Sequence, residues 1–248
     1  MVINPNFYQP SRQQHTSMSD FPPNVSIRPL TIEDINQCIE LEKKGFPEEE
    51  RCSPAKFKYR LTVAPELCSG LFIRDYDYKY NYINLPDVAK SLQEKHDAEE
   101  KLESKKTKAG ESDDEEFPEK SSVVKETLIG HIIATKVDGS RITEASMELP
   151  SNDVKGSGHC EASRYIGIHS VVIAPEWRGK NLAALLLHDY IQKLSNQDMG
   201  DQVVLIAHKE LIPFYEKIGF NNMGESECKF ANTTWYDMAI DLVPADDL

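Results

Sequence analysis

Several features that mark common protein classes are missing from this chain of 248 residues. It has no run of about 18 apolar residues, so the sequence predicts no membrane-spanning helix. Basic residues are in deficit, with 28 against 41 acidic ones, and the net charge of −13 argues against nucleic acid or an anionic membrane surface as a partner. The first residues lack the apolar stretch of a secretory signal, so we expect a cytoplasmic protein.

Cysteine is also scarce. The five cysteines are odd in number, scattered and without a CxxC pair, which predicts neither a zinc ribbon nor a redox motif and fits a reducing compartment. Two nucleotide-binding patterns are absent as well. Neither GxxxxGK followed by Ser or Thr nor GxGxxG occurs, which excludes a Walker loop and a dinucleotide fingerprint.

The acidity is concentrated in one segment. Between Glu94 and Glu119, 11 acidic residues stand against five lysines, which accounts for −6 of the total charge. The stretch over about 81–123 is poor in large apolar residues and cannot bury enough surface to offset its ordering entropy. We therefore predict a disordered tail over 1–24 and a single domain over 25–248, interrupted by a disordered acidic insertion over about 81–123.

Hydrophobic periodicity and helix caps in the remaining chain predict an α/β fold with a mixed sheet. Thr31 and Ser53 are the expected helix starts, and Gly219 is an expected helix end. The predicted strands cover 25–30, 67–76, 126–137, 165–173, 202–207 and 236–242. The predicted helices run from 31 to 45, from 54 to 64, over 142–149, over 181–196 and from 211 to 218.

One segment indicates chemistry. In HSVVIAPEWRGKNLAALLLHDYIQKL, a buried strand runs through a short turn directly into a helix. This geometry aims free backbone N–H groups and the helix dipole at an anion. The small residues Gly179, Ala183 and Ala184 let a phosphate approach the backbone. An ordinary strand–turn–helix connection explains the segment equally well.

Residues 178–183, Arg-Gly-Lys-Asn-Leu-Ala, resemble the acetyl-CoA motif of the GNAT acetyltransferases. Asn181 stands where that motif usually has glycine, although asparagine tolerates left-handed backbone better than most residues. GFPEEERCSP, APELCSGLFI, GIHSVVI and LIPFYEKIGF are similar to segments of the arylalkylamine (serotonin) N-acetyltransferase group, above all to its fungal polyamine acetyltransferases. This resemblance covers about residues 25–77 and 125–242.

The resemblance implies a GNAT fold, with a mostly antiparallel mixed sheet flanked by helices and the insertion in the hairpin of the second and third strands. It implies direct transfer of an acetyl group from acetyl-CoA, as co-substrate and without a metal, to a small primary amine in a ternary complex. Arylalkylamines and polyamines both fit as acceptors. We expect a monomer.

The resemblance also implies residue roles. His169 matches the histidine that takes the amine's proton through water, and an unperturbed pKa near ~6.5 suits a base at neutral pH. Tyr215 matches the tyrosine that protonates the CoA thiolate. Vertebrate members carry a second histidine where this chain has Gly167, and His208 is a candidate substitute.

The acetyl-CoA site implied by the resemblance comprises Val171, Val172, Ile173, Arg178, Gly179, Lys180, Asn181, Leu182, Ala183 and Ala184. Phe46 and Pro54 match the mobile loop over the amine. The neighbouring carboxylates of Glu48, Glu49 and Glu50 are either a solvated run or an attraction for polyamine cations.

Two other functions remain open. The same fold can serve a lysine or peptide N-acetyltransferase, since a fold does not determine its acceptor. Asn181 and Gly167 are the features that would fit an acyl-CoA-binding module without catalysis.

Overall fold

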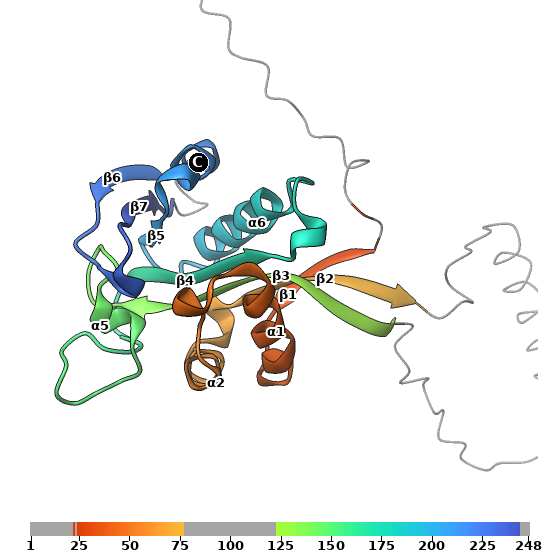
Figure 1. Ribbon diagram of the computed structural model, residues 1–248, viewed down its shortest axis with the longest axis horizontal. Coiled ribbons are helices and arrows are strands. Elements are labelled where there is room, and N and C mark those ends of the chain that lie inside the picture. Colours follow the sequence, from red (N-terminus) through yellow and green to blue (C-terminus); the bar gives the residue numbers. More distant parts are fainter. Residues whose placement is uncertain (1–21, 23, 77–122, 244–248) are drawn as a thin grey trace, which may run out of the picture.

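The computed structural model describes residues 22, 24–76 and 123–243. The predicted tail over 1–24 and the predicted insertion over 81–123 lie almost wholly outside these residues. Within them, seven strands form one sheet flanked by helices (Figure 1). The strands are β1 (Val25–Pro29), β2 (Ser69–Tyr76), β3 (Val123–Val137), β4 (Tyr165–Ile173), β5 (Gln202–Ala207), β6 (Asn221–Glu225) and β7 (Tyr236–Asp241).

The sheet is mixed and mostly antiparallel, as predicted. Its order is β1-β2-β3-β4-β5-β7-β6, and β4 with β5 is the parallel pair among the described strands. The sequence did not predict β6. All five of its residues are exposed, so it lacks the apolar alternation by which a half-buried strand is recognised.

β2 and β3 pair as antiparallel neighbours on either side of residues 77–122, which the structure does not describe. Their register begins with Tyr76 opposite Val123. The place predicted for the insertion, between these two strands, is therefore confirmed. Val123, at the predicted end of the insertion, already belongs to β3.

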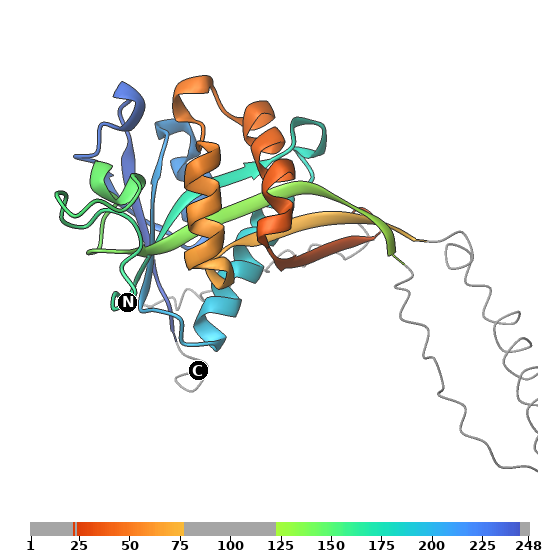
Figure 2. The ribbon, with the colours of Figure 1, turned by 90° about the horizontal axis from the view of Figure 1, so that it is seen from below.

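Helices cover both faces of the sheet (Figures 1 and 2). α1 and α2 pack on one face against β3, while α6 packs on the other with α7 beside it. α2 begins as predicted, because the Ser53 hydroxyl accepts a hydrogen bond from the Lys56 N–H at 3.3 Å. The helices are α1 (Ile35–Gly45), α2 (Pro54–Val63), α5 (Glu144–Met147), α6 (Leu182–Asn196) and α7 (Ile212–Ile218).

Each face of the sheet has its own apolar core. Leu186, Leu187 and Tyr190 of α6 are fully buried on one face, and Phe57 of α2 is fully buried on the other. All five cysteines are free. In the described part of the chain, no helix is both long and apolar enough to cross a membrane.

β4 and β5 are the strands that position the site. They pair only where Tyr165–Gly167 meets Gln202–Val204, although β4 continues to Ile173 and β5 to Ala207. Beyond the paired residues the two strands part. Backbone and side chains at their carboxyl ends therefore face open space instead of a neighbouring strand.

Candidate active site

A cavity of about 660 Å³ lies where β4 ends and α6 begins. Nine of the ten residues predicted for acetyl-CoA line it. The exception is Lys180, whose ammonium nitrogen lies 4.5 Å from the centre of the Trp177 ring. We call this space the donor cavity; the nine predicted residues are Val171, Val172, Ile173, Arg178, Gly179, Asn181, Leu182, Ala183 and Ala184.

The turn between β4 and α6 has the left-handed backbone that the interpretation of Asn181 requires. Asn181 has φ 56° and ψ 16°, and Gly179 has φ 76°. The guanidinium of Arg178 donates to the carbonyls of Ile173 at 3.1 Å and Gly45 at 3.4 Å, which fastens the turn to β4 and α1. The first N–H groups of α6 have no partner within the helix, so they are available to an anion in the donor cavity.

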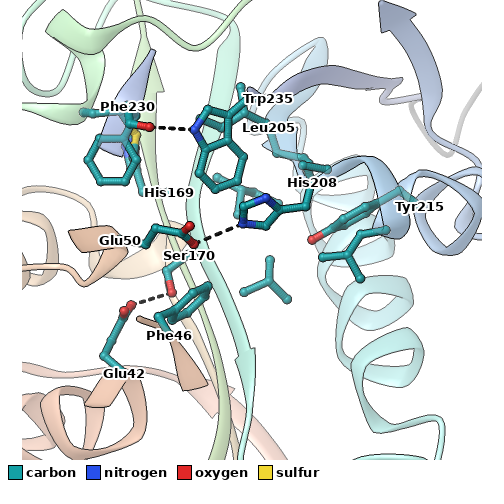
Figure 3. A pocket seen from close by; sticks show the side chains of 16 residues that line it. Glu42, Phe46, Glu50, His169, Ser170, Leu205, His208, Tyr215, Phe230 and Trp235 are labelled. Atoms are coloured by element: carbon teal, nitrogen blue, oxygen red, sulfur yellow. Dashed lines mark hydrogen bonds and ion pairs between the residues drawn. The ribbon is translucent and has the colours of Figure 1, made fainter. Parts of the chain in front are cut away.

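A second cavity, of about 80 Å³, adjoins the donor cavity between the parting strands (Figure 3). Its lining includes the aromatic side chains of Phe46, Phe230 and Trp235. The turn Glu48–Glu50, which follows α1, contacts the turn Phe230–Asn232 between β6 and β7. This contact closes one side of the space, which we call the acceptor cavity.

Six residues line both cavities and form the junction between them: Phe46, Glu50, Val171, His208, Leu211 and Tyr215. Phe46 is thus at the place predicted for the amine pocket. Pro54, also predicted there, is exposed at the start of α2 and lines neither cavity.

Tyr215, on α7, brings its hydroxyl to this junction. Its ring packs edge-on against Phe214 and Phe220, with ring centres 5.1 and 5.6 Å apart. The hydroxyl makes no hydrogen bond to any side chain or carbonyl in the described residues, so it is free to donate to a bound molecule. Burial raises the pKa of Tyr215 above its usual 10, which keeps the hydroxyl protonated at neutral pH.

His169 lies at the acceptor cavity only. It is the extra residue of a bulge in β4, because its two neighbours pair with consecutive residues of β3. Its Nε2 lies 2.7 Å from the Thr135 hydroxyl and its Nδ1 lies 3.3 Å from the Met147 sulfur. Burial, aided by the charges of Arg60 and Lys56, holds the pKa of His169 well below 6.5, so the ring is neutral at pH 7.

With this geometry in place, comparison with known proteins decides the family. The model of the acetyltransferase (GNAT) domain matches residues 105–242, more than half of the chain. The chain belongs to the GNAT acetyltransferase family. A serotonin N-acetyltransferase from Mesocricetus auratus is 26% identical over 115 residues, which span 46% of this chain and 51% of the relative. The chain thus matches about half the length of that curated relative.

Solved structures support the GNAT fold. The loading GNATL domain of CurA from Lyngbya majuscula superimposes with a TM-score of 0.56 at 13% identity, covering 88% of this chain and 98% of that domain. The GphF GNAT-like decarboxylase in complex with isobutyryl-CoA gives a TM-score of 0.53 at 13% identity, covering 88% and 99%. At these identities the likeness concerns the fold alone.

Packing explains why this GNAT chain has Gly167 in place of a second histidine. A Cβ at residue 167 would lie 2.5 Å from Val137 Cγ1 and 2.8 Å from Ile142 Cδ1. Both neighbours belong to a buried apolar cluster. A histidine at this position would therefore displace that cluster.

Sequence reasoning missed a buried polar chain beside the acceptor cavity. Ser170 donates to Glu42 Oε1 at 2.6 Å and lies 3.1 Å from His131 Nε2, while His131 Nδ1 has no partner within the described residues. Glu42 is almost fully buried although it is an acidic residue. It lies one helical turn after Cys38 on the apolar stripe of α1. An acidic residue on a buried stripe is the sequence feature that could have indicated this polar chain.

The run Glu48, Glu49, Glu50 divides into two environments. Glu48 and Glu49 are exposed, as the solvated interpretation predicts. Glu50 turns inward, and its Oε2 lies 3.1 Å from His208 Nε2 (Figure 3). The His208 ring stacks on Trp235 with ring centres 4.2 Å apart.

Proposed function

We propose that this protein transfers the acetyl group of acetyl-CoA to a small primary amine bound in the same complex. One observation carries the proposal. A donor cavity at the strand–turn–helix motif meets a separate acceptor cavity, and the hydroxyl of Tyr215 lies at their junction. This is the arrangement that direct transfer between two bound substrates needs.

The donor cavity suits acetyl-CoA in both charge and shape. The left-handed turn at Gly179 and Asn181 and the free N–H groups of α6 would hold the pyrophosphate. Beyond Gly167, β4 has no β5 partner, so some backbone groups of Val171–Ile173 are left to the pantetheine and the thioester oxygen.

The reaction moves two protons. An alkylammonium has a pKa near ~10, so it must lose one proton before its nitrogen can attack the thioester carbon. As the C–S bond breaks, the hydroxyl of Tyr215 gives its proton to the sulfur and regains one from the acylated nitrogen. A module that only binds acyl-CoA would need no free hydroxyl at this junction.

The acceptor cavity favours a small amine. It is small, partly aromatic, and closed on one side by the contact of Glu48–Glu50 with Phe230–Asn232. A peptide acceptor needs an open groove for its main chain. The aromatic walls suit an arylalkyl group or a cation, and the name of the serotonin N-acetyltransferase relative supports the same class.

The test is CoA release from acetyl-CoA with tryptamine, phenylethylamine, spermidine and a basic lysine peptide as separate acceptors. We expect turnover with at least one small amine and a lower kcat/KM with the peptide. A peptide that reacts better than every amine would support the peptide function instead. Acetyl-CoA binding without turnover on any acceptor would support a binding module.

A further inference from the structure

We propose that His208, held by Glu50, is the group that accepts the proton of the bound ammonium. The inference rests on the proposed function and assigns to His208 the role that the resemblance gave to His169. It also makes Glu50 a positioning residue. Four features of the junction support it.

The first feature is location. The amine attacks where the acceptor and donor cavities meet, and the proton must leave at that place. His208 and Glu50 line both cavities, whereas His169 lines the acceptor cavity alone. His208 comes directly after β5, across the gap that opens when β5 parts from β4. It therefore stands at the junction with Tyr215.

The second feature is a free ring nitrogen. A carboxylate only accepts hydrogen bonds, so the 3.1 Å contact with Glu50 places the ring proton of His208 on Nε2. Its Nδ1 then has a lone pair and no hydrogen-bond partner among the described residues. His169 differs, because the acceptor sulfur of Met147 holds its proton on Nδ1 and the Thr135 hydroxyl occupies Nε2. His169 therefore cannot take a proton from the acceptor cavity without breaking one of these hydrogen bonds.

The third feature is the fixed orientation of the ring. Trp235 stacks on His208 at 4.2 Å, and Trp235 is itself held by a 2.8 Å hydrogen bond to the Phe230 carbonyl. The side chain of Glu50 is only 10% exposed, so its charge is poorly screened by water. A carboxylate in this position stabilises the imidazolium that forms when the ring takes a proton.

The fourth feature is the charge of the surroundings. The other titratable side chains that line the two cavities are Glu42, His169, Arg178, Glu210 and Tyr215. His169 and Tyr215 are neutral at pH 7. Three acidic side chains, those of Glu42, Glu50 and Glu210, therefore stand against the one guanidinium of Arg178 in the lining, a balance that favours an ammonium group.

The proton balance is complete. One N–H bond of the ammonium breaks and its proton moves to His208 Nδ1, which leaves a neutral amine with a lone pair. That pair forms the C–N bond at the thioester carbon, the C–S bond breaks with Tyr215 protonating the sulfur, and Tyr215 regains a proton from the acylated nitrogen. The imidazolium then releases its proton to water, which reaches the 28% exposed side chain of His208.

The experiment compares two amines in the full-length protein. One is the best small amine of the panel, and the other is its β,β-difluorinated analogue, whose weakly basic nitrogen is unprotonated in a large fraction of molecules at pH 7. The variants are His208→Gln, Glu50→Gln and His169→Gln. The matched control is His188→Gln, an exposed histidine of α6 that lines neither cavity.

We expect His208→Gln to lower kcat/KM for the ordinary amine about 100-fold at pH 7, as loss of a general base does. The deficit should shrink about tenfold per pH unit as the free amine fraction rises. On the fluorinated amine the loss should stay within about threefold, because a large fraction of it binds without a proton to be removed. Glu50→Gln should follow the same pattern at about tenfold, and His188→Gln should match the wild type.

Three results would overturn the inference. His208→Gln could match the wild type on the ordinary amine, or it could lose equally on both amines, which is a structural effect. The selective loss could also follow His169→Gln instead. Melting temperature and acetyl-CoA affinity identify a misfolded variant, and Glu50→Gln then decides by the same comparison. If the wild type acetylates no amine at all, the proposed function fails first and this inference falls with it.

Discussion

The turn at Asn181 offers the sharpest test of how the donor cavity is built. Asn181 has left-handed dihedrals and makes no side-chain hydrogen bond to the described residues, so substitution there changes mainly the backbone preference. In the left-handed backbone region a residue with a Cβ is strained by about 1–2 kcal/mol, and asparagine by less than most residues. Glycine has no strain in this region in the folded state, but it lowers the free energy of unfolding by about 0.5–1 kcal/mol because its unfolded chain has greater conformational freedom.

The expected order follows from these two effects. Asn181→Gly should leave the free energy of unfolding within about 0.5 kcal/mol, because relief of strain and unfolded-state entropy nearly cancel. Asn181→Ala should lose about 1 kcal/mol. Because the ligand-free turn is already left-handed, a folded alanine variant carries this strain before acetyl-CoA binds, and its Kd for acetyl-CoA should stay close to the wild-type value.

Urea unfolding of the ligand-free protein and calorimetric titration with acetyl-CoA check both values. Asn196→Ala, at the exposed last residue of α6, is the control for loss of an asparagine and should change neither. An alanine variant as stable as the glycine variant would refute the backbone argument. Equal loss of affinity in both variants would show that the side chain itself contacts the ligand.

Two further predictions concern the junction and the edge of the sheet. Tyr215→Phe should lower kcat at least tenfold, with the KM for acetyl-CoA unchanged within about threefold, because general acid catalysis is worth ~10²–10⁴; equal CoA release by both proteins would contradict it. At Asp34, burial alone would raise the pKa, but hydrogen bonds from Arg28 and the Thr31 N–H outweigh it and hold the pKa below 3.8. The depressed pKa adds stability above pH 3.8 that is lost as the pH falls through the folded-state pKa. Asp34→Asn should therefore cost about 1 kcal/mol at pH 7 in urea unfolding, and the cost should shrink as the pH falls below 3.8.

Most of the fold could be predicted because short sequence patterns, namely apolar runs and helix-cap residues, indicate its strands and its helix starts. β4 and β5 have the bounds predicted from their apolar runs, and α2 begins at its Ser-Pro cap. β6 escaped because an exposed edge strand needs no apolar alternation. β6 forms by antiparallel pairing with β7, and nothing in its own five residues predicts that pairing.

The site was predictable where it follows one segment of the chain and unpredictable where distant segments meet. The part of the donor cavity that was predicted comes from the continuous stretch 171–184, of which nine predicted residues line it, whereas its remaining lining comes from distant segments that include Phe46 and His208. The pair of Glu50 and His208 joins side chains 158 positions apart, and the contact of Ser170 with Glu42 spans 128. No sequence periodicity connects such positions. The sequence therefore suggested only that the run Glu48–Glu50 is either solvated or attracts a cationic substrate.

The parting of β4 and β5 connects the fold to the proposed chemistry. In an antiparallel pair, alternate residues of a strand direct both their N–H and their C=O toward the same neighbour. Half of these backbone groups of β4 face β3, which pairs with β4 along its whole length. The other half face β5, which pairs with β4 only as far as Gly167. From residue 168 onward the remaining groups have no partner on β5, and burying them unpaired would cost about 1–3 kcal/mol each. The gap exposes them instead to the two cavities, where the amide groups of a pantetheine arm and the oxygen of a thioester can satisfy them. Closing the gap by extending the β4–β5 pairing would therefore remove the donor site and the acceptor site together.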